Sequence, residues 1–230
     1  MTEDEQAQKR DFVKGLVTAT ITRPSERDCQ VMPGPSDLAN PCDACVGRKI
    51  AESMGVSALA APKTFSLAAW NGTAVHQKLE ADLPEFYPSA ERELTVPIAS
   101  LKKLGDIEGH VDLYLRDWKI VTDYKTAWAE RIFRYRREGV PFTHACQVFL
   151  YMYGIRNMGL PAETGALVYI PRDSNNVEDI WVASCPYQED VVISTLERAQ
   201  KIVDIVDSGN VDTLESDAHC FVCNRMRGGY

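Results

Sequence analysis

Two short segments in the middle of the chain constrain its fold more than any other part of the sequence. Apolar side chains alternate around Asp112 in residues 109–115, and the chain can turn at residues 118–119 into a second segment that runs through Asp123. Alternation with a period of two residues is typical of a half-buried strand. The two segments therefore predict a β-hairpin.

The predicted hairpin carries two carboxylates and one amine. Asp112 and Asp123 would lie at one end of it, and Lys125 would share a face with Asp123, because side chains two residues apart in a strand point the same way. Carboxylate oxygens are ligands that Mg²⁺ or Mn²⁺ prefers, and the Tyr124 carbonyl offers another. The pattern predicts a divalent-metal site with a lysine that orients or deprotonates a water. Taken alone, Asp-x-Lys is more typical of a solvated strand edge.

The rest of the chain predicts a mixed central sheet flanked by helices, an α/β or α+β fold. Strands are expected in the middle of the chain and helices before and after them. Ser36 or Asp37 is expected to cap a short helix, and Pro97 to close the first strand. The expected strands are 91–96, 107–115, 119–124, 166–170 and 180–184, and the expected helices end near 54 or cover 66–83, 142–157 and 192–206.

The composition is that of a globular protein with one full core. Of the 230 residues, 45% are hydrophobic and 25% are charged, which is ordinary for a soluble domain. No stretch approaches the roughly 18 to 20 apolar residues that cross a bilayer, and the acidic start is unlike a secretory signal. We expect a cytoplasmic protein with reduced cysteines and no membrane association. Residues 29–230 are expected to form one domain after an N-terminal segment, 1–28, that includes an amphipathic stretch.

Positive charge is concentrated in one run directly after Lys125. The net charge of −8 argues against indiscriminate coating of nucleic acid, which depends on local positive charge. A groove needs favourable charge only along its own length, and this run contains Arg131, Arg134, Arg136 and Arg137. A solvated helix face is the alternative interpretation. The position of the run beside the carboxylates favours phosphate binding.

Two Cys-x-x-Cys pairs lie near opposite ends of the sequence. Cys42 with Cys45 and Cys220 with Cys223 can together surround one tetrahedral metal ion or one cluster. The spacing by itself indicates zinc, and free buried cysteines are the alternative. Cys29 is a candidate additional ligand, whereas Cys146 and Cys185 fall in a predicted helix and strand and are expected to pack as small apolar groups.

A wider set of polar residues follows a fixed order along the chain: His76, Gly109-x-x-Asp112, Asp123-Tyr124-Lys125 and Gln147-x-x-x-Tyr151. This arrangement resembles the PD-(D/E)XK nuclease superfamily, in particular its RecB-like branch. The resemblance spans about residues 36–225, with Asp123 where Glu is commoner, and implies a restriction-endonuclease-like nuclease core. It implies that the histidine and both acidic residues bind metal, that the lysine is catalytic, and that the Gln/Tyr pair supports the active site.

The cysteines extend the resemblance to the iron–sulfur subgroup, which includes CRISPR-associated exonucleases and related phage proteins. There, a cysteine before the histidine helix joins cysteines after the last helix to bind a [4Fe–4S] cluster. This chain has two cysteines on each side, whereas the usual distribution is one and three. The resemblance implies a cluster that clasps the terminal elements together, with structural zinc as the alternative.

The resemblance implies a Mg²⁺- or Mn²⁺-dependent deoxyribonuclease, most simply an exonuclease on single-stranded DNA or duplex ends, from a bacterial cell or a phage-infected host. Arg131, Arg134 and Arg137 would contact phosphates, and aromatic residues such as Trp128, Phe133 or Tyr135 would stack on bases. Core packing is the commoner role of such aromatic residues and is the alternative for these three. The rival hypothesis is a non-catalytic, metal-clasped DNA-binding or adaptor protein with partners in recombination, CRISPR adaptation or inhibition of a host complex.

Overall fold

A single mixed sheet organises the molecule. The computed structural model describes residues 3–23, 31–56 and 65–226. The strands are arranged in chain order across the sheet; β3 and β4 are parallel and the other neighbouring pairs are antiparallel. The strands are β1 (Glu91–Leu101), β2 (Gly105–Leu115), β3 (Ile120–Ala127), β4 (Thr164–Pro171) and β5 (Trp181–Pro186).

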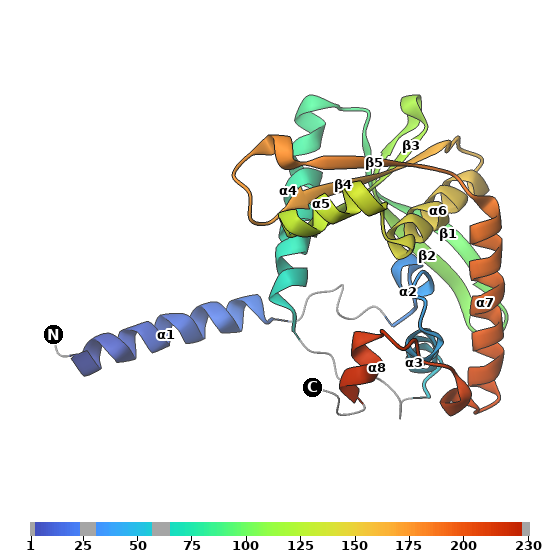
Figure 1. Ribbon diagram of the computed structural model, residues 1–230, viewed down its shortest axis with the longest axis horizontal. Coiled ribbons are helices and arrows are strands. Elements are labelled where there is room, and N and C mark those ends of the chain that lie inside the picture. The colour runs from blue at the N-terminus through green and yellow to red at the C-terminus, as the bar shows by residue number, and fades with distance from the viewer. Residues whose placement is uncertain (1–2, 24–30, 57–64, 227–230) are drawn as a thin grey trace.

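Helices cover both faces of this sheet (Figure 1). The most buried helix, α6, packs on β1 and β4. Helix α7 packs against both α6 and α3. On the other face, Leu79 and Leu83 of α4 pack against Leu113 and Tyr124. The helices are α1 (Glu3–Ile21), α2 (Pro35–Leu38), α3 (Asp43–Ser53), α4 (Leu67–Phe86), α5 (Ala129–Glu138), α6 (Phe142–Asn157), α7 (Glu189–Asp207) and α8 (Phe221–Met226).

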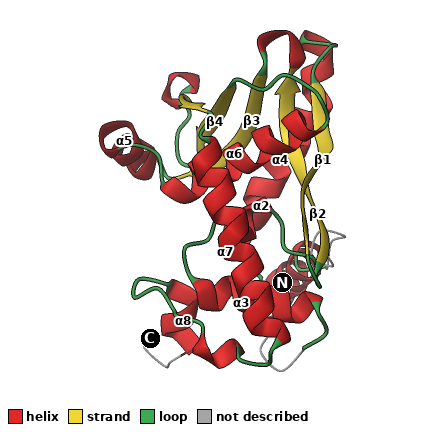
Figure 2. Cartoon of the chain, turned by 90° about the vertical axis from the view of Figure 1, so that its right-hand side faces the viewer, coloured by secondary structure: helices red, strands yellow, loops and turns green. Residues whose placement is uncertain are grey.

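This architecture confirms the expected mixed sheet with flanking helices. The bounds of α6 agree with the predicted helix 142–157. The hairpin turn lies at residues 116–119, where Lys119 adopts a left-handed conformation with φ of 53°. Figure 2 shows α7 descending from the sheet toward α3 and α8, which form a small helical end of the molecule.

Strand β3 and helix α4 each continue three residues beyond their expected ends, to Ala127 and Phe86. Two other expected boundaries were wrong for local reasons. Strand β1 continues through Pro97 to Leu101, because it lies at the edge of the sheet and its register shifts between Pro97 and Ala99; proline is tolerated at such edges and bulges. The cap of α2 is Gly34 rather than Ser36 or Asp37. Asp37 lies inside the helix, and its Oδ2 accepts a hydrogen bond from the Gly34 amide at 2.9 Å.

The N-terminal helix α1 stands apart from the rest of the molecule in Figure 1. Its apolar residues Phe12, Val13, Leu16 and Val17 are each more than half exposed. Cys29, which the sequence suggested as an additional ligand, lies outside the described residues. Among the described helices, none is long and apolar enough to span a membrane.

Candidate active site and metal centre

The candidate active site lies where two neighbouring strands separate. Pairing between β2 and β3 runs from Leu115 opposite Ile120 to Leu113 opposite Thr122. Asp112 is the next residue on β2, and its Oδ2 accepts a hydrogen bond from the Tyr124 amide at 2.7 Å. The Asp112 carboxylate thus satisfies the Tyr124 amide, which lies beyond the end of the β2–β3 pairing. A cleft of about 550 Å³ opens at this point.

His76 joins α4 to the separated strands. Its Nδ1 lies 3.2 Å from Asp112 Oδ1, and its Nε2 lies 3.0 Å from the Tyr124 carbonyl oxygen. Burial opposes the charged imidazolium, but the hydrogen bond and charge of Asp112 outweigh burial, so the pKa of His76 is raised. Both ring nitrogens can then donate. The histidine therefore contacts two of the oxygen groups that the sequence predicted as metal ligands.

A second set of contacts runs from Asp123 into α6. The Lys125 ammonium lies 2.7 Å from Asp123 Oδ2 and donates to Gln147 Oε1 at 2.8 Å. Gln147 Nε2 in turn donates to the Tyr151 hydroxyl at 3.0 Å. Burial raises the pKa of Asp123 to about 6, against the opposing charge of Lys125, and nearby Asp112 adds to the increase. Asp123, Lys125, Gln147 and Tyr151 thus form one connected network.

The packing around this network requires a glycine at position 109. A Cβ atom at this position would lie 2.8 Å from Pro35 Cγ and 2.8 Å from Tyr151 Cε1. Helix α2 and Tyr151 therefore approach the β2 backbone too closely for any side chain. The Gly-x-x-Asp motif therefore has a steric reason. Glycine at position 109 leaves room for Pro35 and Tyr151 in the cleft wall, and Asp112 lines the cleft.

The structure adds acidic residues that the sequence analysis did not select. Glu93 and Glu108 line the cleft together with His110. Glu93 interrupts the β1–β2 pairing opposite Asp112 and has a φ of 47°, a strained value for a residue that is not glycine. Glu108 and His110 lie four and two residues before Asp112, so their common face was readable from the alternation of β2. No sequence pattern indicated that Glu93 would line the cleft.

The cleft donors suit a hard divalent ion. Asp123 is 2% exposed, and its Oδ2 has an ion-pair contact with Lys125 but no hydrogen bond of good geometry. Among the described residues, His76 and the carboxylates do not bring three ligand atoms within 4.8 Å of one another. Magnesium is commonly held by one or two carboxylates and keeps several waters. Asp112, Asp123 and the Tyr124 carbonyl fit that pattern.

The predicted DNA-binding arginines lie outside the cleft. Arg131, Arg134 and Arg137 are exposed on α5, which follows β3 directly, and none of them lines the cleft. Trp128 and Phe133 are 54% and 64% exposed beside them. Tyr135 does not belong to this surface, because its ring packs against Tyr169 at a centroid distance of 5.4 Å. The α5 surface is defined here as those three arginines with Trp128 and Phe133.

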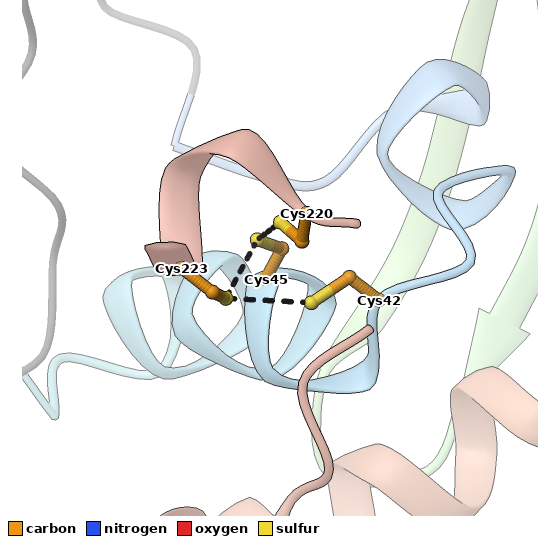
Figure 3. Close-up of side chains that lie close together, drawn as sticks. All are labelled: Cys42, Cys45, Cys220 and Cys223. Carbon is orange, nitrogen blue, oxygen red and sulfur yellow. Dashed lines mark hydrogen bonds between the residues drawn. The ribbon is translucent and has the colours of Figure 1, made fainter. Parts of the chain in front are cut away.

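The four paired cysteines meet at the helical end of the molecule (Figure 3). Cys42 and Cys45 come from the start of α3, and Cys220 and Cys223 come from the start of α8. Their sulfur atoms all lie within 4.8 Å of one another. The tetrad, as we call these four residues, joins N- and C-terminal parts of the chain as expected. Cys146 and Cys185 are buried in the core, also as expected.

Comparisons with known proteins identify the fold. No protein-family model and no curated protein matches the sequence. Among solved structures, an alkaline exonuclease from Laribacter hongkongensis, LHK-Exo, is 8% identical with a TM-score of 0.57, covering 79% of this chain and 90% of that chain. The chain has the fold of this exonuclease.

Two further structures agree. LHK-Exo in complex with dAMP is 10% identical with a TM-score of 0.56, covering 86% of this chain and 94% of that chain. A phage-related exonuclease from Haemophilus somnus 129PT is 10% identical with a TM-score of 0.50, covering 72% of this chain and 83% of that chain. At identities this low the similarity shows a shared fold alone, and the chemistry has to be argued from the cleft.

Proposed function

We propose that the protein is a metal-dependent deoxyribonuclease of the PD-(D/E)XK superfamily that acts as an exonuclease on single-stranded DNA or duplex ends. One observation carries this proposal. His76, Asp112, Asp123 and Lys125 come from three different elements and line a single cleft, where His76 contacts Asp112 and Lys125 contacts Asp123.

The charge of the cleft supports a requirement for metal. Its lining includes five carboxylates, Asp37, Glu93, Glu108, Asp112 and Asp123, and one lysine, Lys125. A phosphodiester is itself an anion, so this lining repels it unless cations are present. Asp112, Asp123, the Tyr124 carbonyl and the neutral form of His76 would hold a divalent ion, which would supply charge neutralisation and a more acidic bound water.

We propose that Lys125 acts on the attacking water. Asp123 and Gln147 both contact its ammonium, so its position in the cleft is fixed. We assign Lys125 to orienting the water and balancing charge on the phosphate. Gln147 and Tyr151 are positioning residues, since they contact the lysine or each other rather than an ion.

The substrate assignment uses the α5 surface and the structural neighbours. Arginine side chains pair well with phosphate, and exposed aromatic rings stack on bases of single strands. Two structural neighbours are described as exonucleases, and one LHK-Exo structure contains dAMP. These features favour DNA with an accessible end.

The direct test measures cleavage by Asp123→Ala and Lys125→Ala variants. Single-stranded and duplex DNA, labelled at either end, is incubated with Mg²⁺, Mn²⁺ or no added metal. We expect the lysine variant to lose about 10²- to 10⁴-fold in rate, and the aspartate variant to lose at least about 10³-fold, because several kcal/mol of charge stabilisation disappears. Undiminished cleavage by both variants would overturn the assignment.

Lys119→Ala is the matched control, because Lys119 precedes the same strand but pairs with Glu163 on the surface. It should cleave like the unaltered protein. Tight DNA binding by the unaltered protein without cleavage at any metal would instead support the adaptor hypothesis. The position of the label in the first products reports the polarity of digestion.

A further inference from the structure

The sulfur atoms of the tetrad are unusually close together for an iron–sulfur site. Cys45 Sγ lies 3.3 Å from Cys220 Sγ and 3.6 Å from Cys223 Sγ, and Cys42 Sγ lies 3.5 Å from Cys223 Sγ. Every pair lies within 4.8 Å. Figure 3 shows the four side chains converging on one small volume.

This spacing matches one tetrahedral ion. Zinc–thiolate bonds of about 2.3 Å in a tetrahedron place the sulfur atoms about 3.8 Å apart. A [4Fe–4S] cluster requires a wider opening, because four irons and four sulfides stand between the cysteine sulfurs. The residues present therefore do not fit the cluster that the family resemblance implies, and they fit a single ion.

The local backbone also favours a single ion. Each Cys-x-x-Cys pair occupies one turn: the Cys45 amide donates to the Cys42 carbonyl at 3.0 Å, and the second pair spans the start of α8. The Ala44 amide donates to the Glu215 carbonyl at 3.0 Å, which ties the two cysteine-bearing segments together beside the sulfurs. Two such turns facing each other form the usual structural zinc arrangement.

Arg48 supplies positive charge to this group. Its Nη2 donates to Cys223 Sγ at 2.8 Å and to Cys45 Sγ at 3.3 Å. Arg48 lies three residues after Cys45 on α3, so its side chain shares a face with that cysteine. Four thiolates around a divalent ion carry a net charge of −2, and a neighbouring guanidinium compensates part of it.

We infer that the tetrad holds a single zinc ion in tetrahedral coordination and that Arg48 stabilises the bound ion by hydrogen bonding to two of its sulfur ligands. The inference is independent of the proposed nuclease activity, because it concerns only the helical end of the molecule.

The first experiment measures metal and sulfide in the full-length protein, purified without oxygen from cells supplied with both iron and zinc. Apoprotein is also treated with iron and sulfide and, separately, titrated with Co²⁺ as a spectroscopic probe. We expect one zinc per chain, no acid-labile sulfide, and saturation by one Co²⁺ with the visible bands of tetrahedral thiolate coordination. Zinc at one equivalent should prevent cluster assembly.

Three outcomes overturn the inference. They are iron with matching acid-labile sulfide in the purified protein, assembly of a brown cluster in the presence of equimolar zinc, and iron without sulfide in place of zinc. A Cys29→Ser variant should bind metal like the unaltered protein, since the tetrad is complete without Cys29.

The second experiment tests Arg48. Zinc affinity is measured by chelator competition for Arg48→Gln and for Lys49→Gln, which removes the same charge from the next residue. We expect Arg48→Gln to bind zinc roughly 10- to 100-fold more weakly and Lys49→Gln to be unchanged. Circular dichroism of both apoproteins separates loss of folding from loss of affinity. Equal zinc affinity in a folded Arg48→Gln protein overturns the role of Arg48.

Discussion

The cleft and the tetrad arrange their candidate metal-ligating atoms differently. Cleft donors are oxygen atoms and an imidazole that contact one another pairwise and do not converge on one point, whereas the tetrad brings four sulfurs within 4.8 Å. Structural metal sites are closed by protein ligands, and catalytic sites keep positions open for water and substrate. The proposed zinc site is therefore of the closed kind, and the proposed cleft site is of the open kind.

Removing metal from each site should affect stability very differently. Loss of the tetrad ion should lower Tm by more than about 10 °C, because structural zinc contributes many kcal/mol and each kcal/mol shifts Tm by about 2–4 °C at this size. Omitting Mg²⁺ should shift Tm by less than about 2 °C. Thermal unfolding with a zinc-selective chelator, and separately without Mg²⁺, measures both. Equal shifts would contradict the division into closed and open sites.

Asp123→Asn should stabilise the protein while abolishing cleavage. The folded-state pKa of about 6 lies above the ordinary value of 3.8, so the folded state favours the protonated acid. The stability that this group contributes is present at low pH and is lost as pH rises from about 4 to 6. At pH 7 without Mg²⁺, the variant should be more stable by up to about 3 kcal/mol. Denaturant unfolding across pH 4–8 tests this, and an unchanged pH slope would contradict it.

Combined substitution of Arg131, Arg134 and Arg137 by Gln should weaken DNA binding and leave the chemistry intact. We expect KM to rise at least about 10-fold with little change in kcat, and the salt dependence of binding to fall by about 0.7 per arginine. Steady-state kinetics at several salt concentrations provides the measurement. Arg116→Gln, in the β2–β3 turn, is the control. A fall in kcat alone would place α5 outside the binding surface.

Glu93→Gly should produce the smallest change. Glycine adopts the φ of 47° at Glu93 without steric cost, so the variant should gain up to about 1 kcal/mol in free energy of unfolding. Glu93→Ala removes the same carboxylate but keeps the strain, and should not gain. Chemical denaturation distinguishes them. Equal stability of the two variants would show that the backbone strain is negligible.

The sequence was most informative where the pattern is local. Alternation around Asp112 predicted the hairpin, and the spacing of Asp123, Lys125, Gln147 and Tyr151 predicted the residues that the fold then connects. Helix α6 was predicted to the residue because its apolar positions recur at helical spacing through a segment with a buried centre.

What the sequence could not provide depends on contacts between distant segments. Helix α2 became a cleft wall only because Pro35 reaches Gly109. Arg48 acquired its partners only when α8 returned to α3. Pro97 was misread because nothing local marks β1 as an edge strand. Sequence periodicity indicates neither the position of α2 in the cleft wall nor the contacts of Arg48, since both arise from tertiary packing.

The separation of the cysteines along the chain has a consequence for biosynthesis. Cys42 and Cys223 are 181 residues apart, so during translation the first pair emerges from the ribosome long before the second. The sheet and its cleft can form before Cys220 and Cys223 are available to complete the tetrad with Cys42 and Cys45. Metal capture would then be the final event in maturation, and a chain cut short before Cys220 would leave its first cysteine pair exposed to oxidation or to quality-control proteases.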